Sequence, residues 1–383
     1  MNPMLSQIHS LPALIREAAQ PFDNAARQTL DHALCLSAKR LFVTGCGDSH
    51  HASLGSELAF ETLAGLPAEP MTALQFARYA AGFLPEGRPG TTLVIGISVS
   101  GEVSRTLEAL TLARRAGATT VALTATPGSR VANAAEHVYL AQTTPFPEPP
   151  GAHTPGVRSY LVSQLALLLM AVRLGEVRGR LNPADAAAVR KEILSLADAA
   201  EKTIEACDQA ARALAEEWKD AKEFIFVGGG PNFATALFSA AKVLEASGDP
   251  ALGQDTEEWG HLQYFAKAVD TPTFFISAGD RDLSRMVEAA VAAKTIGRRV
   301  VAVAPAAATA LRQAAARSLT LPEGVREMFS PLVAAIPGEL FAAHRSDLIG
   351  EPFFRSFGGG RDQEGGGGIS RIRTSEVWET NRL

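Results

Sequence analysis

The chain has 383 residues, of which 46% are hydrophobic and 20% are charged. This balance is typical of a globular protein with apolar cores, and the length predicts about two to three domains. Acidic residues outnumber basic ones by 41 to 36, which gives a formal net charge of −5. A nucleic-acid or anionic-membrane partner is therefore not expected, because no overall basic field exists to attract one.

The first 36 residues are predicted to form N-terminal capping helices, with a break at Pro21, because apolar residues recur at helical spacing. From Arg40 onward, short β-branched runs alternate with alanine-rich helical stretches. The predicted strands cover 41–44, 92–97 and 119–124, and the predicted helices cover 51–62 and 103–116. Strands that alternate with helices predict parallel pairing and a doubly wound α/β sheet.

The same order of elements returns in the second half of the chain. Its predicted strands cover 224–227, 273–277 and 299–303, and its predicted helices cover 232–247 and 282–296. Ser104-Arg105 and Glu108 recur as Ser284-Arg285 and Glu288, at a constant offset of 180 residues. An offset this long indicates a duplicated domain, since solenoid repeats are only about 20 to 50 residues long.

The predicted organisation follows from this duplication. Capping helices in 1–36 precede a first flavodoxin-like domain in 37–181, and linking helices in 182–220 begin at Pro183 and lead to a second such domain in 221–350. A glycine-rich tail fills 351–383. The most apolar stretch, 161–174, is predicted to be a buried helix that is too short to cross a bilayer. Three isolated cysteines and no recognisable signal peptide predict a cytoplasmic protein.

The strand predicted at 92–97 leads into a serine-rich loop, Ser98-Val99-Ser100-Gly101, followed by Ser104 and Thr106 at the start of a helix. Backbone amides and hydroxyls at such a position suit a phosphate group, and a glycine lets the backbone approach it. The alternative is that the hydroxyls are ordinary N-caps. The duplication favours phosphate, because the second copy has Ser277-Ala278-Gly279-Asp280 there, with an acid where an anion would lie.

A glycine turn, Gly45-Cys46-Gly47, follows the strand predicted at 41–44 and precedes Asp48 and Ser49. The third glycine of the dinucleotide fingerprint is missing, so NAD and other cofactors are not expected. Gly47, Asp48 and Ser49 are instead candidates for contacts with sugar hydroxyls. Neighbouring His50-His51 are more simply explained by capping or packing than by a metal site, so no metal is predicted.

An acid and histidine cluster follows in the second domain. Lys242 and Glu245 fall on one helical face, and Glu258 and His261 lie a few residues further on. Proton transfer next to a carbonyl needs a carboxylate, and sugar-ring opening needs an acid/base such as histidine. A solvated pair of Lys242 with Glu245, and a buried, satisfied His261, are the structural alternatives.

Together these motifs resemble the sugar isomerase (SIS) domain family. The similarity is to the tandem pair in the isomerase half of glucosamine-6-phosphate synthase and in related phosphosugar isomerases, deaminases and deglycases. That family has Cys-Gly-Thr-Ser where this chain has Cys46-Gly47-Asp48-Ser49, and Ser-Gln-Ser-Gly-Glu where it has 98–102. Glu245 also precedes His261 by sixteen residues, and the resemblance covers about 5–344.

The resemblance implies an enzyme that isomerises, deaminates or deglycates a phosphorylated sugar or amino sugar through an enediol or enediolamine. It implies phosphate contacts from Ser98, Ser100 and Thr106 near the Val99 backbone, and sugar contacts near Gly47, Asp48, Ser49 and Glu258. Glu245 is then the proton-transfer base, and His261 the ring-opening group, which reaches the partner's site in a homodimer. A non-catalytic phosphosugar sensor is the alternative, although the residues before Leu41 are too few and insufficiently basic for a helix-turn-helix domain.

Two departures from the family pattern limit what the resemblance implies. No glutaminase segment with an N-terminal cysteine nucleophile precedes the first predicted domain, so glutamine-dependent amination is not expected. Lys294 is the last lysine, and the tail carries Arg361, Arg371 and Arg373, whose guanidinium groups cannot form an imine. The apolar and charged order from Ile369 to Trp378 predicts that the tail docks and closes over the ligand.

Overall fold

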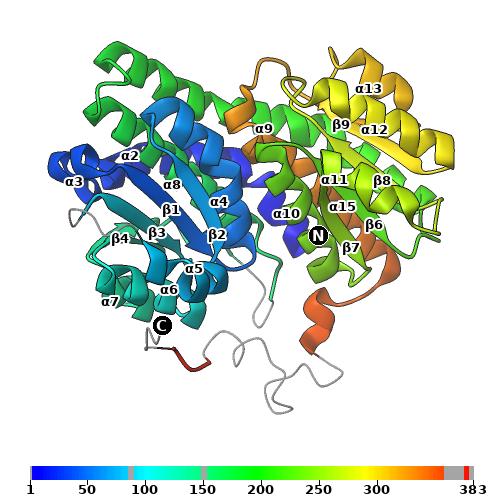
Figure 1. Cartoon of the computed structure of the whole chain (residues 1–383). Helices are drawn as coiled ribbons and strands as arrows, with labels where there is room; N and C mark the ends of the chain where they lie inside the picture. The colour runs from blue at the N-terminus through cyan, green and yellow to red at the C-terminus, as the bar shows by residue number, and fades with distance from the viewer. Residues whose placement is uncertain (1, 85–89, 148–152, 358–374, 379–383) are drawn as a thin grey trace. The chain divides into compact units, whose positions relative to one another are not determined.

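The computed structural model describes residues 2–84, 90–147, 153–357 and 375–378 of the chain (Figure 1). The chain packs into two compact units, neither of which is one continuous segment. The first lobe consists of Leu14–Pro145, Ser159–Leu194 and Phe357–Leu383, and the second lobe consists of Met1–Ala13, Phe146–Arg158 and Ser195–Ser356.

The first lobe is built on a parallel five-stranded sheet with the order β2-β1-β3-β4-β5. The strands are β1 (Arg40–Gly45), β2 (Ala68–Thr72), β3 (Thr92–Ile97), β4 (Thr119–Thr124) and β5 (His137–Leu140). The three predicted strands of this half are confirmed, and the two edge strands β2 and β5 are additions. Because β1 pairs with both β2 and β3, the strand order reverses beside β1.

Helices cover both faces of this sheet (Figure 1). Phe42, Val94 and Ala122 point to one face and pack with the buried residues of α5 and α6. The strand residues between them, such as Val43 and Ile95, are buried as well, so the opposite face is also covered. The helices of this lobe are α2 (Leu11–Thr29), α3 (His32–Ser37), α4 (Asp48–Ala59), a π-helix (Phe60–Ala64), α5 (Ala73–Tyr79), a 3₁₀ turn (Ala81–Phe83), α6 (Ser104–Arg115), α7 (Arg130–Ala134) and α8 (Val157–Val177).

The second lobe repeats this architecture. Its parallel sheet has the order β10-β9-β8-β6-β7, with β6 (Phe224–Gly228), β7 (Ala251–Asp255), β8 (Pro272–Ile276), β9 (Arg299–Pro305) and β10 (Arg317–Leu321). Its helices are α1 (Pro3–His9), α10 (Pro231–Ala246), α11 (Thr256–His261), α12 (Leu283–Ile296), α13 (Thr309–Ala314), α14 (Pro331–Ala334) and α15 (Ile336–Ile349), with 3₁₀ turns at Gln263–Phe265, Glu327–Phe329 and Phe353–Phe357. Each strand has its counterpart in the first lobe in the same position of the sheet.

The two copies agree even in backbone conformation. Gly47, which precedes α4, has φ 55° and ψ −126°, and Gly230, which precedes α10, has φ 52° and ψ −129°. Only glycine adopts such angles without strain, so both turns require the residue that the sequence has there. The predicted fold class, two flavodoxin-like doubly wound sheets related by duplication, is confirmed.

Two helical predictions were wrong in detail. The predicted break at Pro21 does not occur, because Pro21 lies inside α2, whose buried residues include Leu14, Ile15, Phe22 and Ala26. Burial of this apolar face outweighs the roughly 3 kcal/mol that an internal proline costs a helix. The apolar helix α8 is also longer than predicted, and by length and composition it is the one helix in the described part of the chain that could cross a membrane. However, 89% of its most apolar window is buried inside the protein, as the sequence predicted.

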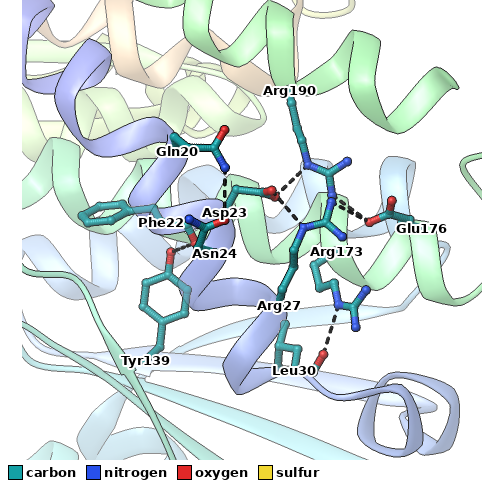
Figure 2. Close-up of polar contacts among 10 residues, drawn as sticks. All are labelled: Gln20, Phe22, Asp23, Asn24, Arg27, Leu30, Tyr139, Arg173, Glu176 and Arg190. Atoms are coloured by element: carbon teal, nitrogen blue, oxygen red, sulfur yellow. Dashed lines mark hydrogen bonds and ion pairs between the residues drawn. The ribbon is translucent and has the colours of Figure 1, made fainter. Parts of the chain in front are cut away.

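A helix begins at Pro183 as predicted, and this helix, α9 (Pro183–Glu217), divides between the lobes after Leu194. Its first part is tied into the first lobe by a network of charges around the buried carboxylate of Asp23 (Figure 2). Arg190 of α9 donates to Asp23 of α2 and to Glu176 of α8, both over 2.7 Å, and Arg27 donates to Asp23 over 3.0 Å. Two arginines and two carboxylates therefore hold three helices together.

Candidate functional site

The strand order of the first lobe reverses beside β1, where helices leave β1 and β3 for opposite faces of the sheet. Ligands of open α/β sheets bind in the crevice that this reversal creates at the carboxyl ends of the strands. The residues 46–49 follow β1 and the residues 98–101 follow β3. The structure therefore places the two loops predicted from the sequence at the carboxyl ends of two adjacent strands, beside this reversal.

The serine loop is held in one conformation by backbone hydrogen bonds. The Gly101 amide donates to the Ser98 carbonyl over 2.9 Å, and the Ala125 amide donates to the Val99 carbonyl over 3.1 Å. Gly101 has φ +71°, and a Cβ atom there would lie 2.0 Å from Oγ of Ser129. Glycine is thus required both by the backbone angle and by the neighbouring side chain.

The hydroxyls of this loop do not cap the helix that follows. The N-cap of α6 is Val103, and no side chain makes a capping hydrogen bond there. Ser98 and Ser104 are buried, and their hydroxyls have no hydrogen-bond partner among the described residues. A buried hydroxyl without a partner costs about 1–3 kcal/mol. The loop and the helix start that follows it therefore carry two such hydroxyls and no side-chain cap.

The other candidate hydroxyls are arranged differently. Thr106 is buried, and its hydroxyl donates to the Ile97 carbonyl over 3.4 Å, so it already has a partner inside the lobe. Ser100 is exposed, and its hydroxyl accepts a hydrogen bond of 3.4 Å from the Glu102 amide. Of these four hydroxyls, those of Ser98 and Ser104 are thus without a partner among the described residues, and both are shielded from solvent.

The loop after β1 contributes polar groups on the other side of the crevice. Gly47 precedes α4, and Asp48 and Ser49 are the first two residues of that helix. Burial raises the pKa of the Cys46 thiol, while the Thr106 hydroxyl and the Arg105 guanidinium lower it. Cys46 also packs against the core cluster that contains the buried residues of α5 and α6.

The paired histidines are partly buried. Nδ1 of His51 lies 3.8 Å from the Asp48 carboxylate, and Nδ1 of His50 lies 3.4 Å from the Ser53 hydroxyl. Burial lowers the pKa of His50. Within the described ranges no group of three or more potential metal ligands occurs.

The equivalent crevice of the second lobe is occupied by a side chain of the lobe itself. The Ser277 hydroxyl donates to the Asp282 carboxylate over 2.8 Å, and the Gly279 amide donates to the Ser277 hydroxyl over 3.0 Å. Burial raises the pKa of Asp282, against the lowering effect of hydrogen bonds from Ser277 and from the backbone at Asp282 and Gly229. The second copy thus already holds a carboxylate where the first copy has unpartnered hydroxyls.

The two candidate catalytic residues lie in the second lobe but not beside each other. Glu245 is near the end of α10, before β7, whereas His261 ends α11, which follows β7. Helix α10 returns to the amino edge of the parallel sheet and α11 starts at its carboxyl edge, so one strand length, about 17 Å for five residues, separates the two regions. The structure therefore does not bring Glu245 and His261 together within one protomer's second lobe.

The surroundings of these residues differ from the structural alternatives considered above. Nζ of Lys242 lies 2.5 Å from the Glu245 carboxylate, but the Lys242 side chain is fully buried rather than solvated. His261 is exposed and lies 3.2 Å from Glu257, so it is not a buried imidazole. Glu258 is also exposed. His261 is thus accessible to a group from outside its own lobe.

Sequence reasoning assigned no role to Arg105, the second residue of α6. Its side chain is partly buried, and its guanidinium pairs with the buried carboxylate of Glu108. The signal was present in the sequence, because the Arg105 and Glu108 pair is one of the features that repeat as Arg285 and Glu288.

Comparison with known proteins agrees with this geometry. Residues 35–173 match the family model described as the SIS domain. The glutamine–fructose-6-phosphate aminotransferase [isomerizing] of Halobacterium salinarum is 31% identical over 362 residues, which cover 91% of this chain and 57% of that protein. The protein of the same name from Gloeobacter violaceus is 29% identical over 345 residues, covering 89% and 55%. The chain spans about half the length of these curated relatives.

Solved structures show the same fold. The C-terminal domain of glucosamine-fructose-6-phosphate aminotransferase from Francisella tularensis superposes with a TM-score of 0.77 at 20% identity, over 91% of this chain and 96% of that one. Tagatose-6-phosphate ketose/aldose isomerase from Escherichia coli superposes with a TM-score of 0.71 at 15% identity, over 92% and 94%. With the serine loop at the switch point and the duplicated sheets, this chain resembles the SIS domain family, whose model matches residues 35–173.

Proposed function

We propose that this chain binds a phosphorylated sugar or amino sugar and isomerises it, or removes its amino group, through an enediol or enediolamine. The observation that carries the proposal is the uncapped start of α6 with its two buried, unpartnered serine hydroxyls. A phosphate dianion there would accept hydrogen bonds from both hydroxyls and from the first amides of the helix. Related proteins whose names include fructose-6-phosphate and tagatose-6-phosphate support this substrate class.

The sugar-binding role falls to the loop after β1. Gly47 permits the turn, and the carboxylate of Asp48 and the hydroxyl of Ser49 would hydrogen-bond sugar hydroxyls, with Glu258 as a further contact. The phosphate end of the substrate would lie on 98–101, with Ser100, Ser104 and Thr106 nearby. This arrangement would hold an open-chain sugar with its carbonyl end away from the anion site.

The chemical step is assigned to Glu245. Its carboxylate would take the proton from the carbon next to the carbonyl and return a proton to the neighbouring carbon, which exchanges the carbonyl and hydroxyl positions. The buried ammonium group of Lys242, 2.5 Å away, favours the ionised carboxylate that this step needs. His261 would move the proton that opens the sugar ring.

The separation of Glu245 and His261 supports a homodimer in which each site takes its histidine from the partner. His261 is exposed, as such a residue must be in an isolated protomer. We further propose a cytoplasmic location, because α8 is buried within the fold and all three cysteines are free.

Thermal-shift measurements against a panel of hexose and hexosamine phosphates test the binding proposal, since a bound ligand raises the melting temperature by mass action. Substituting both Ser98 and Ser104 by alanine should leave the melting temperature of the free protein unchanged or raised, because two unsatisfied hydroxyls are removed. The same double variant should weaken binding of the active sugar phosphate by about 10- to 100-fold, the value of one or two charge-assisted hydrogen bonds.

Ser163→Ala is the matched control. Ser163 is buried in α8, and its hydroxyl donates to the Ser159 carbonyl over 2.9 Å. This variant should lose a little stability and keep the full ligand-induced shift. A panel in which only non-phosphorylated sugars respond would contradict the proposal, and binding of a sugar phosphate without turnover would favour the sensor alternative.

A further inference from the structure

The last described residues of the chain, Ser375–Trp378, lie against α5 and α6 of the first lobe (Figure 1). The Arg105 guanidinium donates to the Glu376 carbonyl and, over 3.4 Å, to the Ser375 hydroxyl. The Trp378 amide donates to the Glu108 carboxylate over 2.9 Å. The tail segment is therefore held through its backbone by two side chains of α6.

The Trp378 side chain makes a separate contact with α5. The Arg78 guanidinium lies 5.4 Å from the centre of the Trp378 ring, within the range of a cation–π interaction. A pocket between α5 and the tail is lined by Arg78, Tyr79, Glu376, Val377 and Trp378. Backbone recognition and an aromatic contact together form a built site for this segment.

Glu108 is the centre of the site. Its side chain is fully buried, and it accepts a 2.7 Å hydrogen bond from Arg78 as well as bonds from Arg105 and from the Trp378 amide. A buried carboxylate is costly unless its oxygens are satisfied. The docked tail thus contributes one of the bonds that stabilise a charge inside the first lobe.

The equivalent cluster in the second lobe has the opposite charge balance. There Arg285 pairs with Glu288 and with Glu257 of α11, each over 2.6 Å, and all three side chains are exposed. The first lobe has two guanidinium groups around one carboxylate, and the second lobe has one guanidinium group between two carboxylates. Of these two described clusters, only the one in the first lobe therefore has more guanidinium groups than carboxylates.

That extra positive charge lies in the first turn of the helix that follows the phosphate loop. Arg105 is the second residue of α6 and follows Ser104, whose buried hydroxyl has no partner among the described residues. Its guanidinium also lowers the pKa of the Cys46 thiol, although burial raises that pKa. Fixing an arginine side chain in one rotamer costs about 2 kcal/mol of conformational entropy, and the interactions that fix it must offset this cost. In the docked state, Glu108 and the Glu376 carbonyl already fix this side chain in the first turn of α6.

We propose that Arg78, Arg105 and Glu108 form a docking site for Ser375–Trp378, and that docking positions Arg105 so that it strengthens anion binding at the serine loop. The coupling is reciprocal, so an anion bound at the loop must tighten the docking of the tail by the same factor. Arg105 is a positioning residue in this scheme, and the coupling rests on the proposed phosphate site.

Inorganic phosphate and the fluorescence of Trp378 test the coupling in the full chain. The chain has three tryptophans, and Trp218 and Trp259 are buried whereas Trp378 is 37% exposed, so the difference between wild type and Trp378→Phe isolates the tail signal. Phosphate titration should shift this signal and protect it from acrylamide quenching, with a midpoint equal to the Kd from calorimetry.

Trp378→Ala should weaken phosphate binding by about 5-fold or more, the lower end of typical coupling between sites. Because Trp378 lies in the tail, this variant should keep the melting temperature of the lobe nearly unchanged. Arg285→Ala, the counterpart of Arg105 in the second lobe, should alter neither phosphate affinity nor the Trp378 signal. Unchanged phosphate affinity in Trp378→Ala, with no Trp378 response in the wild type, would overturn the coupling.

The two proposals fail in different ways. If the wild type binds no phosphate, the proposed anion site is wrong. The docking of the tail segment can then still be tested in the absence of phosphate. In that case Arg78→Ala and Glu108→Gln should each make Trp378 more accessible to acrylamide than in the wild type. Equal quenching in all three proteins would reject the docking site itself.

Discussion

Asp282 shows how one side chain distinguishes two copies of the same crevice. It fills the position beside Ser277 with a carboxylate, and burial raises its pKa above the ordinary value. The ionised form is therefore destabilised in the folded state relative to the unfolded chain. In the first lobe the hydroxyls of Ser98 and Ser104 have no hydrogen-bond partner among the described residues, so no carboxylate of the lobe satisfies them.

The substitution Asp282→Asn should stabilise the protein at neutral pH. The pKa of Asp282 is raised in the folded state, so the folded protein binds the carboxyl proton more tightly than the unfolded chain does. The wild type therefore gains stability as the pH falls towards the pKa of Asp282 in the unfolded chain. We expect Asp282→Asn to raise the melting temperature by about 2 to 4 °C at pH 7. The advantage should shrink as the pH is lowered towards about 4, the ordinary pKa of an aspartate.

The check is a set of melting curves of both proteins across this acidic-to-neutral range. The Ser277 hydroxyl can still donate to the side-chain amide oxygen that the substitution introduces, so lost hydrogen bonding should not mask the effect. A difference between the two proteins that stays constant with pH would show that Asp282 titrates alike in the folded and unfolded states.

For individual residues, the sequence predicted the positions of the two loops better than the hydrogen-bond partners of their side chains. The serine loop and the glycine turn were found because a strand, a glycine and hydroxyl residues follow one another locally. The unpartnered state of Ser98 and Ser104 could not be predicted, since it depends on Val103 serving as the N-cap. The contact of Arg105 with the tail joins residues 271 positions apart, which no local pattern reveals.

Among the elements, α9 is attached to the first lobe by the charge network of Figure 2. Asp23 is buried and bonded to both Arg27 and Arg190, and Glu176 satisfies the same two arginines from α8. Removing a partner from a buried ion network leaves the remaining charges uncompensated, which costs about 3–5 kcal/mol. The attachment of α9 should therefore depend strongly on Asp23.

The substitution Asp23→Ala should lower the free energy of unfolding of the first lobe by about 3 kcal/mol, measured by urea denaturation. Glu216→Ala is the matched control, because it breaks the exposed pair with Arg212 on the same helix α9 and should cost less than about 1 kcal/mol. Equal effects of the two substitutions would mean that the buried network adds no more than a surface ion pair.

The strands that the sequence missed share one property. β2, β5, β7 and β10 are the sheet edges, and their residues are partly exposed, so their hydrophobic runs are short and interrupted. The central strands are buried on both faces and read as continuous apolar runs. The prediction therefore succeeded for the central strands, which precede the two loops of the candidate site. It failed for the edge strands, which are recognised by their backbone pairing and not by a buried apolar run.

At the scale of the whole molecule, the predicted domain boundaries remain a prediction. The two compact units of the structure are assembled from other segments of the chain. The predicted capping helices in 1–36 split after Ala13, and the predicted linker in 182–220 splits after Leu194. The tail prediction is met only in part, because 358–374 and 379–383, with Ile369, Arg361, Arg371 and Arg373, lie outside the described residues. Hydrophobic periodicity is a local property of the sequence, so it cannot predict which distant segments of the chain pack into the same compact unit.

If each site takes Glu245 from one protomer and His261 from the other, two inactive variants should complement each other. Glu245→Gln and His261→Ala should each be strongly impaired alone. After mixing, unfolding and refolding together, half of the dimers are mixed, and each mixed dimer has one intact site, so about a quarter of wild-type activity should return. Each variant refolded alone is the control, and no recovery above these controls would reject the shared site.

The assignment of α1 to the second lobe has a consequence for synthesis. Asn2 donates to Asp347 of α15, 345 residues further along the chain, and the apolar face of α1, with Met4 and Ile8, is fully buried. At a ribosomal rate of about 5–20 residues per second, this helix waits roughly 20–70 s for its partner to be made. An early segment with exposed apolar side chains must be shielded during that interval, so the nascent chain should depend on chaperones more than its compact end state suggests.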